Sequence, residues 1–476
     1  MAATAMFATA TWAGGLMTNT NYHIAFDRMF ARGASTEIDA TFSNPAGLAW
    51  GHEGWQLSLN FQKPWQNRDI EININNFLAN PTVENPGETF HKKYNGKASA
   101  PIVPALFASY KKDRWAVSGM IGIVGSGGFV QYDDGVPMFN VLLNSTITKL
   151  TKGLSDATQG AIPPITPDQY TLDSEMKGKQ YIYGGQLNFS YKITDYLAAA
   201  VGFRANYYDG YYRGHVIADN HATKGKLASL LLDVDQKGWG FTPIISLAFH
   251  QGPLTLTARY EFRTKISTKN DTNVLDADLN TTKMVTEPLT QLVVAGAITA
   301  AQAQAIGQGI QQQLSGGFSD YTAPYEDGAR TRYDMPALFT VAAGYEFSPK
   351  LRATLEYHFF DDKNAKMAND RQKELTHGTH EFLAGVEYDI NEKFTVSCGG
   401  QRTDYGLSDG YQQNTSFACD SWSIGMGGAW NINEKIRLNA SYFCSLYSNY
   451  DKVVSYGKET YSRTNHVIGI GVDYKF

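Results

Sequence analysis

The chain has 476 residues, of which 43% are apolar, 13% are aromatic and only 18% are charged, against roughly 25% charged residues in ordinary soluble domains. No stretch approaches the roughly 20 continuous apolar residues that a membrane helix needs, so the composition excludes membrane-spanning helices and favours strands. The net charge of -5 provides no basic field for phosphate backbones, which argues against nucleic-acid binding.

The first 13 residues, MAATAMFATATWA, resemble the apolar part of a secretory signal that ends near Ala13, although they lack its positively charged start. We interpret residues 1–13 as the remnant of a signal peptide; a disordered tail is the alternative. Residues 14–50, which follow, show no alternation of polar and apolar side chains. They contain the sequence TFSNPAGLAW, in which Pro45 fixes one backbone angle and Gly47 frees another.

From Trp55 onward the chain repeats stretches in which every second side chain is apolar or aromatic. In residues 54–63, for example, Trp55, Leu57 and Phe61 lie on one face, and polar side chains lie on the other. A period of two is that of a β-strand with one apolar and one polar face. Aromatic residues gather at the ends of these segments, as in the two interfacial girdles of membrane barrels.

Fourteen such segments lie near residues 54–63, 102–111, 114–124, 180–192, 196–209, 238–250, 253–266, 335–347, 350–360, 380–390, 393–404, 417–430, 434–447 and 464–476. Tight connections, such as KKDR and QGP, alternate with long ones. Bacterial membrane barrels combine an even number of strands with short periplasmic turns and long extracellular loops. We therefore predict an all-β fold for residues 51–476: a transmembrane antiparallel β-barrel of about 14 strands, with outer-membrane lipid and the barrel assembly machinery as partners.

An even number of strands places both ends of the barrel on the periplasmic side. Residues 14–50 would then enter the lumen from that side, because they precede the first strand and are too few to build a core of their own. We predict that they form a hatch, or plug, inside the barrel. Its central motif is Asn44, Pro45, Ala46 and Gly47.

The run from Asp39 to Trp50, which holds Asn44-Pro45-Ala46, resembles the hatch motif of the FadL/TodX family of outer-membrane transporters for long-chain fatty acids and hydrocarbons. Four further stretches are similar to that family: PALFASYKKDRWAVSGMIGI (104–123), YGGQLNFSYKITDYLAAAVGFR (183–204), GWGFTPIISLAF (238–249) and MPALFTVAAGYEF (335–347). The resemblance spans the whole chain. It includes the strand count, since the family barrel has fourteen strands and an N-terminal plug.

The resemblance implies passive, hatch-gated diffusion of hydrophobic compounds, with lateral exit through a gap in the barrel wall near a kinked third strand. It implies no cofactor. The matching segment here ends in a stretch that includes Gly125, Ser126, Gly127 and Gly128, and glycine within a strand commonly marks a bulge or bend. We expect the lateral gap at these residues; a plain exit of the strand into a loop is the alternative.

The long connections carry apolar residues at helical spacing. They occur in residues 138–150, 226–232 and after Pro288, where Thr299-x-x-Gln302 also resembles a capping box. Apolar helices outside the membrane should cover something apolar, so we predict a capture site for hydrophobic ligands; mutual packing as a lid is the alternative. The candidate residues are Leu142, Leu143, Leu230, Leu231, Leu292, Ile306 and Ile310.

Alternation points several charged side chains into the lumen. A carboxylate ligand would need a cation near its head group, and Arg204, Arg259 and Arg352 are the candidates. In the alternative interpretation these arginines pair with lumen carboxylates or with the plug.

Enzymatic motifs are missing from the sequence. It holds no G-x-S-x-G elbow, Walker loop or HExxH, and its three cysteines lack the CxxC spacing of a zinc site. The run from His377 to Glu381 is interpreted as solvated loop rather than a metal site, so we predict no catalytic residue, no metal and no enzyme. A general hydrophilic porin, a receptor barrel that captures haem or another ligand, and a membrane enzyme remain the alternatives.

Overall fold

The structure is a computed structural model that describes residues 15–74, 90–222, 225–314 and 322–476, apart from residue 456. The predicted signal remnant, residues 1–13, lies outside the described residues. The first described residues are not part of the sheet. The strands begin at Gly54.

Fourteen antiparallel strands form a closed barrel, in agreement with the sequence prediction. Ten of them are continuous: β1 (Gly54–Ile74), β4 (Trp115–Tyr132), β5 (Tyr170–Lys192), β6 (Leu197–Asn220), β7 (Lys226–Gln251), β12 (Leu351–Phe360), β13 (Thr379–Asp389), β14 (Phe394–Asp404), β15 (Ser421–Asn431) and β18 (Gly457–Lys475). The first strand pairs with the last over the full register from Gln56↔Lys475 to Ile74↔Gly457. This pairing closes the sheet, so that no strand edge is left without a hydrogen-bonding partner.

The other four barrel strands are each divided into two pieces. The pieces are β2 (Phe90–Ser99) with β3 (Val103–Lys112), β8 (Leu254–Glu261) with β9 (Ser267–Leu279), β10 (Arg330–Arg332) with β11 (Leu338–Ser348), and β16 (Ile436–Tyr447) with β17 (Tyr450–Val454). In each pair both pieces lie between the same two neighbouring strands, for example β2 and β3 between β1 and β4.

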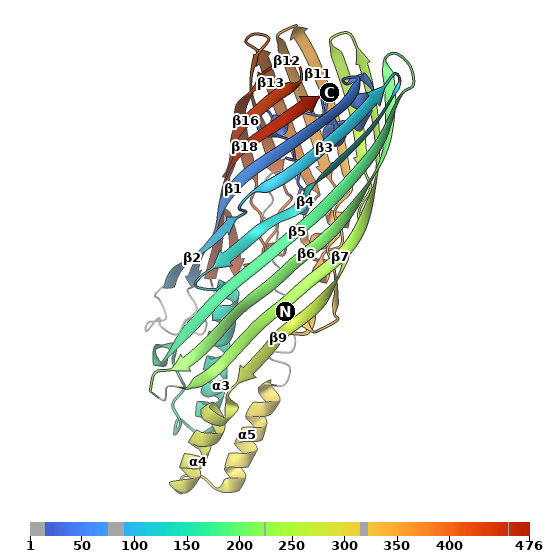
Figure 1. Cartoon of the computed structure of the whole chain (residues 1–476). Helices are drawn as coiled ribbons and strands as arrows, with labels where there is room; N and C mark the ends of the chain where they lie inside the picture. The colour runs from blue at the N-terminus through green and yellow to red at the C-terminus, as the bar shows by residue number, and fades with distance from the viewer. Residues whose placement is uncertain (1–14, 75–89, 223–224, 315–321, 456) are drawn as a thin grey trace.

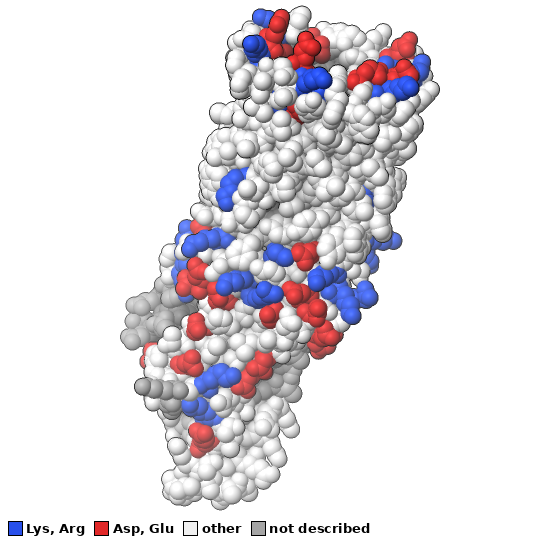
Figure 2. Space-filling view, viewed as in Figure 1, with Lys and Arg blue, Asp and Glu red and all other residues white. Residues whose placement is uncertain are grey.

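The two faces of the wall follow the predicted alternation. In β1, the side chains of Gln56, Ser58 and Asn60 are buried inside the barrel, whereas Leu57 and Leu59 are exposed on its outside. Figure 2 shows the result on one face of the barrel, a nearly uncharged band between two zones of charged side chains. Such a band is the surface that a barrel presents to hydrocarbon.

Short turns join the strands at one end of the barrel, as predicted. An example is the link between β3 and β4, which consists of residues 113–114. At the opposite end lie the longer connections, with the helices α3 (Pro137–Ala157), α4 (Glu287–Val294) and α5 (Ala300–Leu314). Figure 1 shows these helices beyond the barrel rim, at the end away from the C-terminus. We call the two ends the short-turn end and the helix end.

The predicted helices around residues 138–150 and after Pro288 are confirmed as α3, α4 and α5. The capping box is also confirmed, because the Gln302 side chain accepts from the Thr299 backbone N–H at 2.8 Å, while the Thr299 hydroxyl accepts from the Gln302 N–H at 3.2 Å. Within the described residues, no helix is long and apolar enough to cross a membrane.

The helical prediction for residues 226–232 is wrong. These residues begin strand β7, in which Leu230 pairs with Val216 of β6 and with Ala277 of β9. The strands β5, β6 and β7 extend well past the segments 180–192, 196–209 and 238–250 that alternation indicated. Neighbouring strands on both sides supply the backbone hydrogen bonds here, and this pairing outweighs the helical spacing of the leucines.

Candidate functional site

The N-terminal segment, defined here as residues 15–51, is almost entirely buried and bonds to strands around the whole barrel. His23 contacts Ser58 of β1 and Asp473 of β18, at 3.0 and 3.1 Å from its Nε2. On the opposite side, the Thr257 hydroxyl of β8 donates to the Gly33 carbonyl at 2.8 Å. A segment that reaches strands on opposite sides of a closed barrel lies in its lumen. Its short helices are α1 (Ile24–Asp27), α2 (Ala40–Ser43) and the 3-10 helix η1 (Pro45–Trp50).

The motif from Asn44 to Gly47 forms a tight turn in this segment. The Asn44 side chain accepts from the Gly47 N–H at 3.2 Å and donates to the Ser35 carbonyl at 3.0 Å. A Cβ atom at Gly47 would lie 2.6 Å from the Ser35 carbonyl oxygen, so only glycine fits there. Ala46 packs among small residues of β6 and β7, which allows η1 to lie directly against the wall.

Ion pairs attach the N-terminal segment to the wall near the short-turn end. Arg28 is fully buried and pairs with Glu387 of β13. Glu37 bridges Arg32 of the same segment, at 2.8 Å, and Arg437 of β16, at 2.6 Å. Fully buried charges such as Arg28 and Glu387 are retained only when they are paired. The pairs therefore link the position of the segment to that of the wall.

The three predicted lumen arginines are all engaged with protein groups. Arg204 pairs with Glu261, and Arg259 lies 3.3 Å from the same carboxylate and also donates to the Phe42 carbonyl. Arg352 binds Asp389 at 2.6 Å, near the short-turn end. The structure thus brings Arg204 and Arg259 together around Glu261, with Arg352 in a separate ion-pair group. Their role as ligand contacts stays a prediction.

The wall is interrupted beside the predicted gap. Strand β4 pairs with β3 from Trp115 to Ile121 and with β2 from Phe129 to Tyr132. The intervening residues, 122–128, have no ladder partner on that side in the described pairings. On its other side β4 stays paired with β5, but through two bulges, between Ile123 and Gly125 and between Ser126 and Gly128.

The predicted gap residues Gly125, Ser126, Gly127 and Gly128 therefore lie inside a strand, and the alternative of a plain exit into a loop is wrong. Bulges add an unpaired residue and bend the strand away from its neighbour. Gly128 has a φ of 133°, a backbone conformation that side chains disfavour. The glycines thus permit the bend that separates β4 from β3.

The N-terminal segment covers this interruption from inside. The Asn19 backbone N–H donates to the Val124 carbonyl at 3.1 Å, and its side-chain amide donates to the Ile123 carbonyl at 3.2 Å. The Tyr22 hydroxyl also donates to Val124, at 3.1 Å. These donors satisfy carbonyl groups that a continuous strand would have satisfied. The sequence analysis did not identify Asn19 or Tyr22, because their acceptors are backbone atoms that have no signature in the sequence.

An apolar cluster lies at the helix end. It joins α3, α5 and the extensions of the long strands, and it contains Leu143, Leu230 and Ile310 with Ile306 packed against them. A small apolar pocket opens within it, lined by Phe139, Met176, Gly214, His215, Val216, Leu230, Leu232, Leu275, Thr322 and Tyr325. Of the predicted capture residues, Leu142, Leu231 and Leu292 are only half-buried and do not belong to this cluster.

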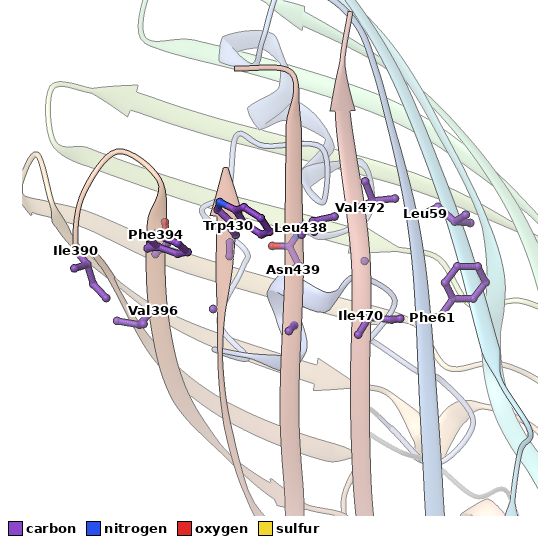
Figure 3. Close-up of a pocket in the computed structure, with 15 residues that line it drawn as sticks. Leu59, Phe61, Ile390, Phe394, Val396, Trp430, Leu438, Asn439, Ile470 and Val472 are labelled. Carbon is purple, nitrogen blue, oxygen red and sulfur yellow. The ribbon is translucent and has the colours of Figure 1, made fainter. Parts of the chain in front are cut away.

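A larger groove, of about 690 Å³, lies on the outside of the barrel. Figure 3 shows side chains from five neighbouring strands around it, among them Phe61, Trp430 and Ile470. These side chains are 37–60% exposed and face away from the lumen, and the groove deepens at Gly428 and Ala440 because those residues are small. It is therefore part of the lipid-facing surface and separate from the lumen.

Comparisons with known proteins agree with this architecture. The family model described as "Outer membrane protein beta-barrel domain" matches residues 290–476. A Pseudomonas aeruginosa FadL homologue is 12% identical and superposes with a TM-score of 0.60, over 97% of this chain and all of the other. The Pseudomonas putida toluene transporter TodX (13% identity, TM-score 0.55) covers 97% of this chain and all of its own.

The Ralstonia pickettii toluene transporter TbuX is 13% identical, with a TM-score of 0.50 over 92% of this chain and 94% of its own. No curated protein matches the chain in sequence. At these identities the similarity establishes the fold, which is that of FadL-type outer-membrane barrels.

Proposed function

We propose that this protein, an outer-membrane β-barrel with the FadL-type fold, transports hydrophobic compounds by passive diffusion. The compounds are long-chain fatty acids or aromatic hydrocarbons. A FadL homologue and two toluene transporters share the fold, which supports this class of cargo. In this proposal the helix end is extracellular and the short-turn end is periplasmic, as in other bacterial barrels.

The proposed route begins at the apolar pocket of the helix end. A hydrophobic solute leaves water favourably for an apolar surface, at roughly 25 cal/mol per Å² of apolar area removed from water. The pocket between α3, β7 and Tyr325 offers such a surface outside the membrane band. Arg204, Arg259 and Arg352 would then attract a carboxylate head group in the lumen, in competition with Glu261, Glu387 and Asp389.

The N-terminal segment acts as the hatch in this proposal, with Asn44 to Gly47 as its rigid turn. The single observation that carries the proposal is the interrupted pairing between β3 and β4 at residues 122–128, covered from inside by Asn19 and Tyr22. When the segment moves away, a solute in the lumen reaches hydrocarbon directly through the wall. Such a route spares the solute from crossing the aqueous periplasmic mouth.

The proposal is tested by uptake into outer-membrane vesicles that carry the protein. Radiolabelled fatty acid and toluene are compared with a small hydrophilic sugar, in the wild type and in Pro45→Ala. We expect the apolar compounds to be taken up in preference to the sugar, and apolar uptake to fall when Pro45 is replaced. Sugar permeation without apolar uptake would replace this proposal with a general hydrophilic pore.

A further inference from the structure

The edge of the lipid-facing band at the helix end is marked on β6 and β7 by an aromatic pair. The rings of Tyr207 and Trp239 lie 4.7 Å apart between centroids, and Trp239 is 61% exposed on the outer face. From there toward the short turns, the outward side chains of β7 are apolar, and one of them, Phe241, stacks on Phe203 of β6 at 5.5 Å. Tyr and Trp at such positions mark the interface between hydrocarbon and head groups.

A row of three cations crosses the wall directly beyond this edge. Lys237 of β7 is the cross-strand partner of Lys269 of β9, and Lys269 is the partner of Arg330 of β10. All three are exposed. Their inward neighbours Gln236 and Asn270 are buried and hydrogen-bonded to each other at 2.8 Å, so the cations project outward. We call Lys237, Lys269 and Arg330 the basic row.

The basic row differs from the other charges around it. Nearby Lys179 is bound to Asp209 at 2.7 Å, and Arg213 is bound to Asp233 at 2.9 Å. Within the described residues, by contrast, no carboxylate lies within ion-pair distance of the three cations of the row. Figure 2 shows the belt of mixed charge to which this level of the wall belongs.

The acidic residues closest along the strands are Asp235 and Asp271. They form the next outward-facing row, farther from the aromatic edge, and are each other's cross-strand partners. Asp235 also accepts from Arg213 at 3.4 Å. At the same level, Asp209 of β6 is the cross-strand partner of Lys237, but it is bound to Lys179 at 2.7 Å, while Asp235 and Asp271 stand one row farther from the hydrocarbon. A lipid whose chains lie against Trp239 and Phe241 would present its head group to the cations first.

We propose that the basic row binds the phosphates of a phosphorylated glycolipid of the outer leaflet. Like charges placed on neighbouring strands repel each other unless an anion lies between them, and cations at a membrane surface attract anionic head groups. Neighbouring strands are about 4.8 Å apart, so the row spans roughly 10 Å. That span exceeds a single phosphate and fits two phosphates on one head group. This inference concerns the outer surface; it rests on the proposed orientation of the barrel and not on transport itself.

The test is native mass spectrometry of the purified full-length protein with diphosphorylated lipid A as the probe, compared with the same lipid after removal of its phosphates. The variant carries Lys237→Gln, Lys269→Gln and Arg330→Gln. The matched control carries Lys97→Gln, Lys177→Gln and Lys458→Gln, three outward cations that are each paired with a carboxylate.

We expect the wild type and the control to prefer the phosphorylated lipid, and the variant of the basic row to bind it about 10- to 100-fold more weakly. Two results would overturn the proposal. One is equal binding of both lipids by the wild type, which requires no variant. The other is an equal loss of binding in the variant and the control, which would mean that any surface cation suffices.

Discussion

At the scale of single residues, the contact between the N-terminal segment and β4 depends on the absence of a side chain at Gly125. A Cβ atom there would collide with the Met17 carbonyl oxygen and lie 3.2 Å from Met335. Gly122 stands three residues earlier in the same strand, and a Cβ atom there would meet only ordinary contacts, the nearest at 3.5 Å from Ala105.

We therefore predict that Gly125→Ala displaces residues 17–19 from the wall, whereas Gly122→Ala does not. With the cover over the interruption loosened, apolar uptake should rise several-fold in Gly125→Ala. Uptake of radiolabelled fatty acid into vesicles measures this effect. Equal uptake by the two variants would show that the segment does not limit passage through the wall.

Asp362 makes the stability of the loop between β12 and β13 depend on pH. Burial raises the pKa of this carboxyl to about 7, from an ordinary value of about 3.9, although the Thr379 N–H donates to it at 3.2 Å. At a pH between these two pKa values, the Asp362 carboxyl is protonated in the folded loop and ionised in the unfolded loop. Its stability is therefore complete at low pH and falls as the pH rises through 7.

We predict that hydrogen-exchange protection of residues 361–378, corrected for the intrinsic exchange rate, falls about tenfold or more between pH 5 and pH 8, since each pKa unit corresponds to a factor of ten. Asp362→Asn should keep its protection across this range, because the amide stays neutral. Exposed Asp370 of the same loop offers the control, and Asp370→Asn should show the same fall in protection between pH 5 and pH 8 as the wild type does. A wild-type loop with no pH dependence would contradict this account of Asp362.

At the scale of elements, Glu37 connects the N-terminal segment to β16 through Arg437. Glu37→Gln leaves the largely buried Arg437 guanidinium with a weaker partner. Breaking one side of a buried ion pair typically costs about 3–5 kcal/mol. The cost is smaller here, because Glu37 is 42% exposed. We predict faster cleavage of the N-terminal segment by a protease added at the short-turn end.

The control for that experiment is Glu392→Gln. Glu37 and Glu392 both line a polar cavity at the short-turn end, but Glu392 forms no ion pair among the described residues. Intact-mass analysis after limited proteolysis distinguishes the two variants. If both resist cleavage as the wild type does, the Glu37 ion pair does not hold the segment in place.

The sequence predicted the elements that a membrane imposes and missed those that depend on distant contacts. Alternation and tight turns identified the strands, because a wall with hydrocarbon on one side and polar groups on the other requires both. Residues 226–232 were misassigned, because their leucines fit a helix as well as a strand and only pairing with β6 and β9 decides between them. Periodicity alone does not resolve short apolar runs.

The sequence likewise predicted only part of the candidate site. The glycines of β4 and the motif around Pro45 are visible in the sequence, because each reflects a local backbone requirement. The cover provided by Asn19 and Tyr22 is not visible, because it depends on carbonyl groups about a hundred residues away in the chain. The pairing of Arg204 with Glu261 likewise follows from strand register rather than from any local motif.

At the scale of the whole molecule, a closed barrel leaves no unpaired edge in hydrocarbon, and in this barrel residues 122–128 of β4 have no ladder partner in β2 or β3 within the described pairings. An unsatisfied backbone group in a bilayer costs several kcal/mol, so an interruption of this kind is retained only if something inside satisfies it. The N-terminal segment supplies those hydrogen bonds at Ile123 and Val124. The central claim is therefore that the interruption is the exit of the transport route.

The most direct measurement removes the two bulges that bend β4 at the interruption and leaves the barrel intact. Deleting Val124 and Gly127, the extra residue of each bulge, restores a continuous ladder between β4 and β5 and keeps the inward and outward faces of β4. The control deletes the exposed residues 163–164 in the connection after α3, and circular dichroism checks that both barrels fold. We predict that apolar uptake falls at least ~10-fold in the bulge deletion and is retained in the control. Apolar uptake that persists through a folded barrel with a continuous β4 would contradict a lateral exit at this stretch.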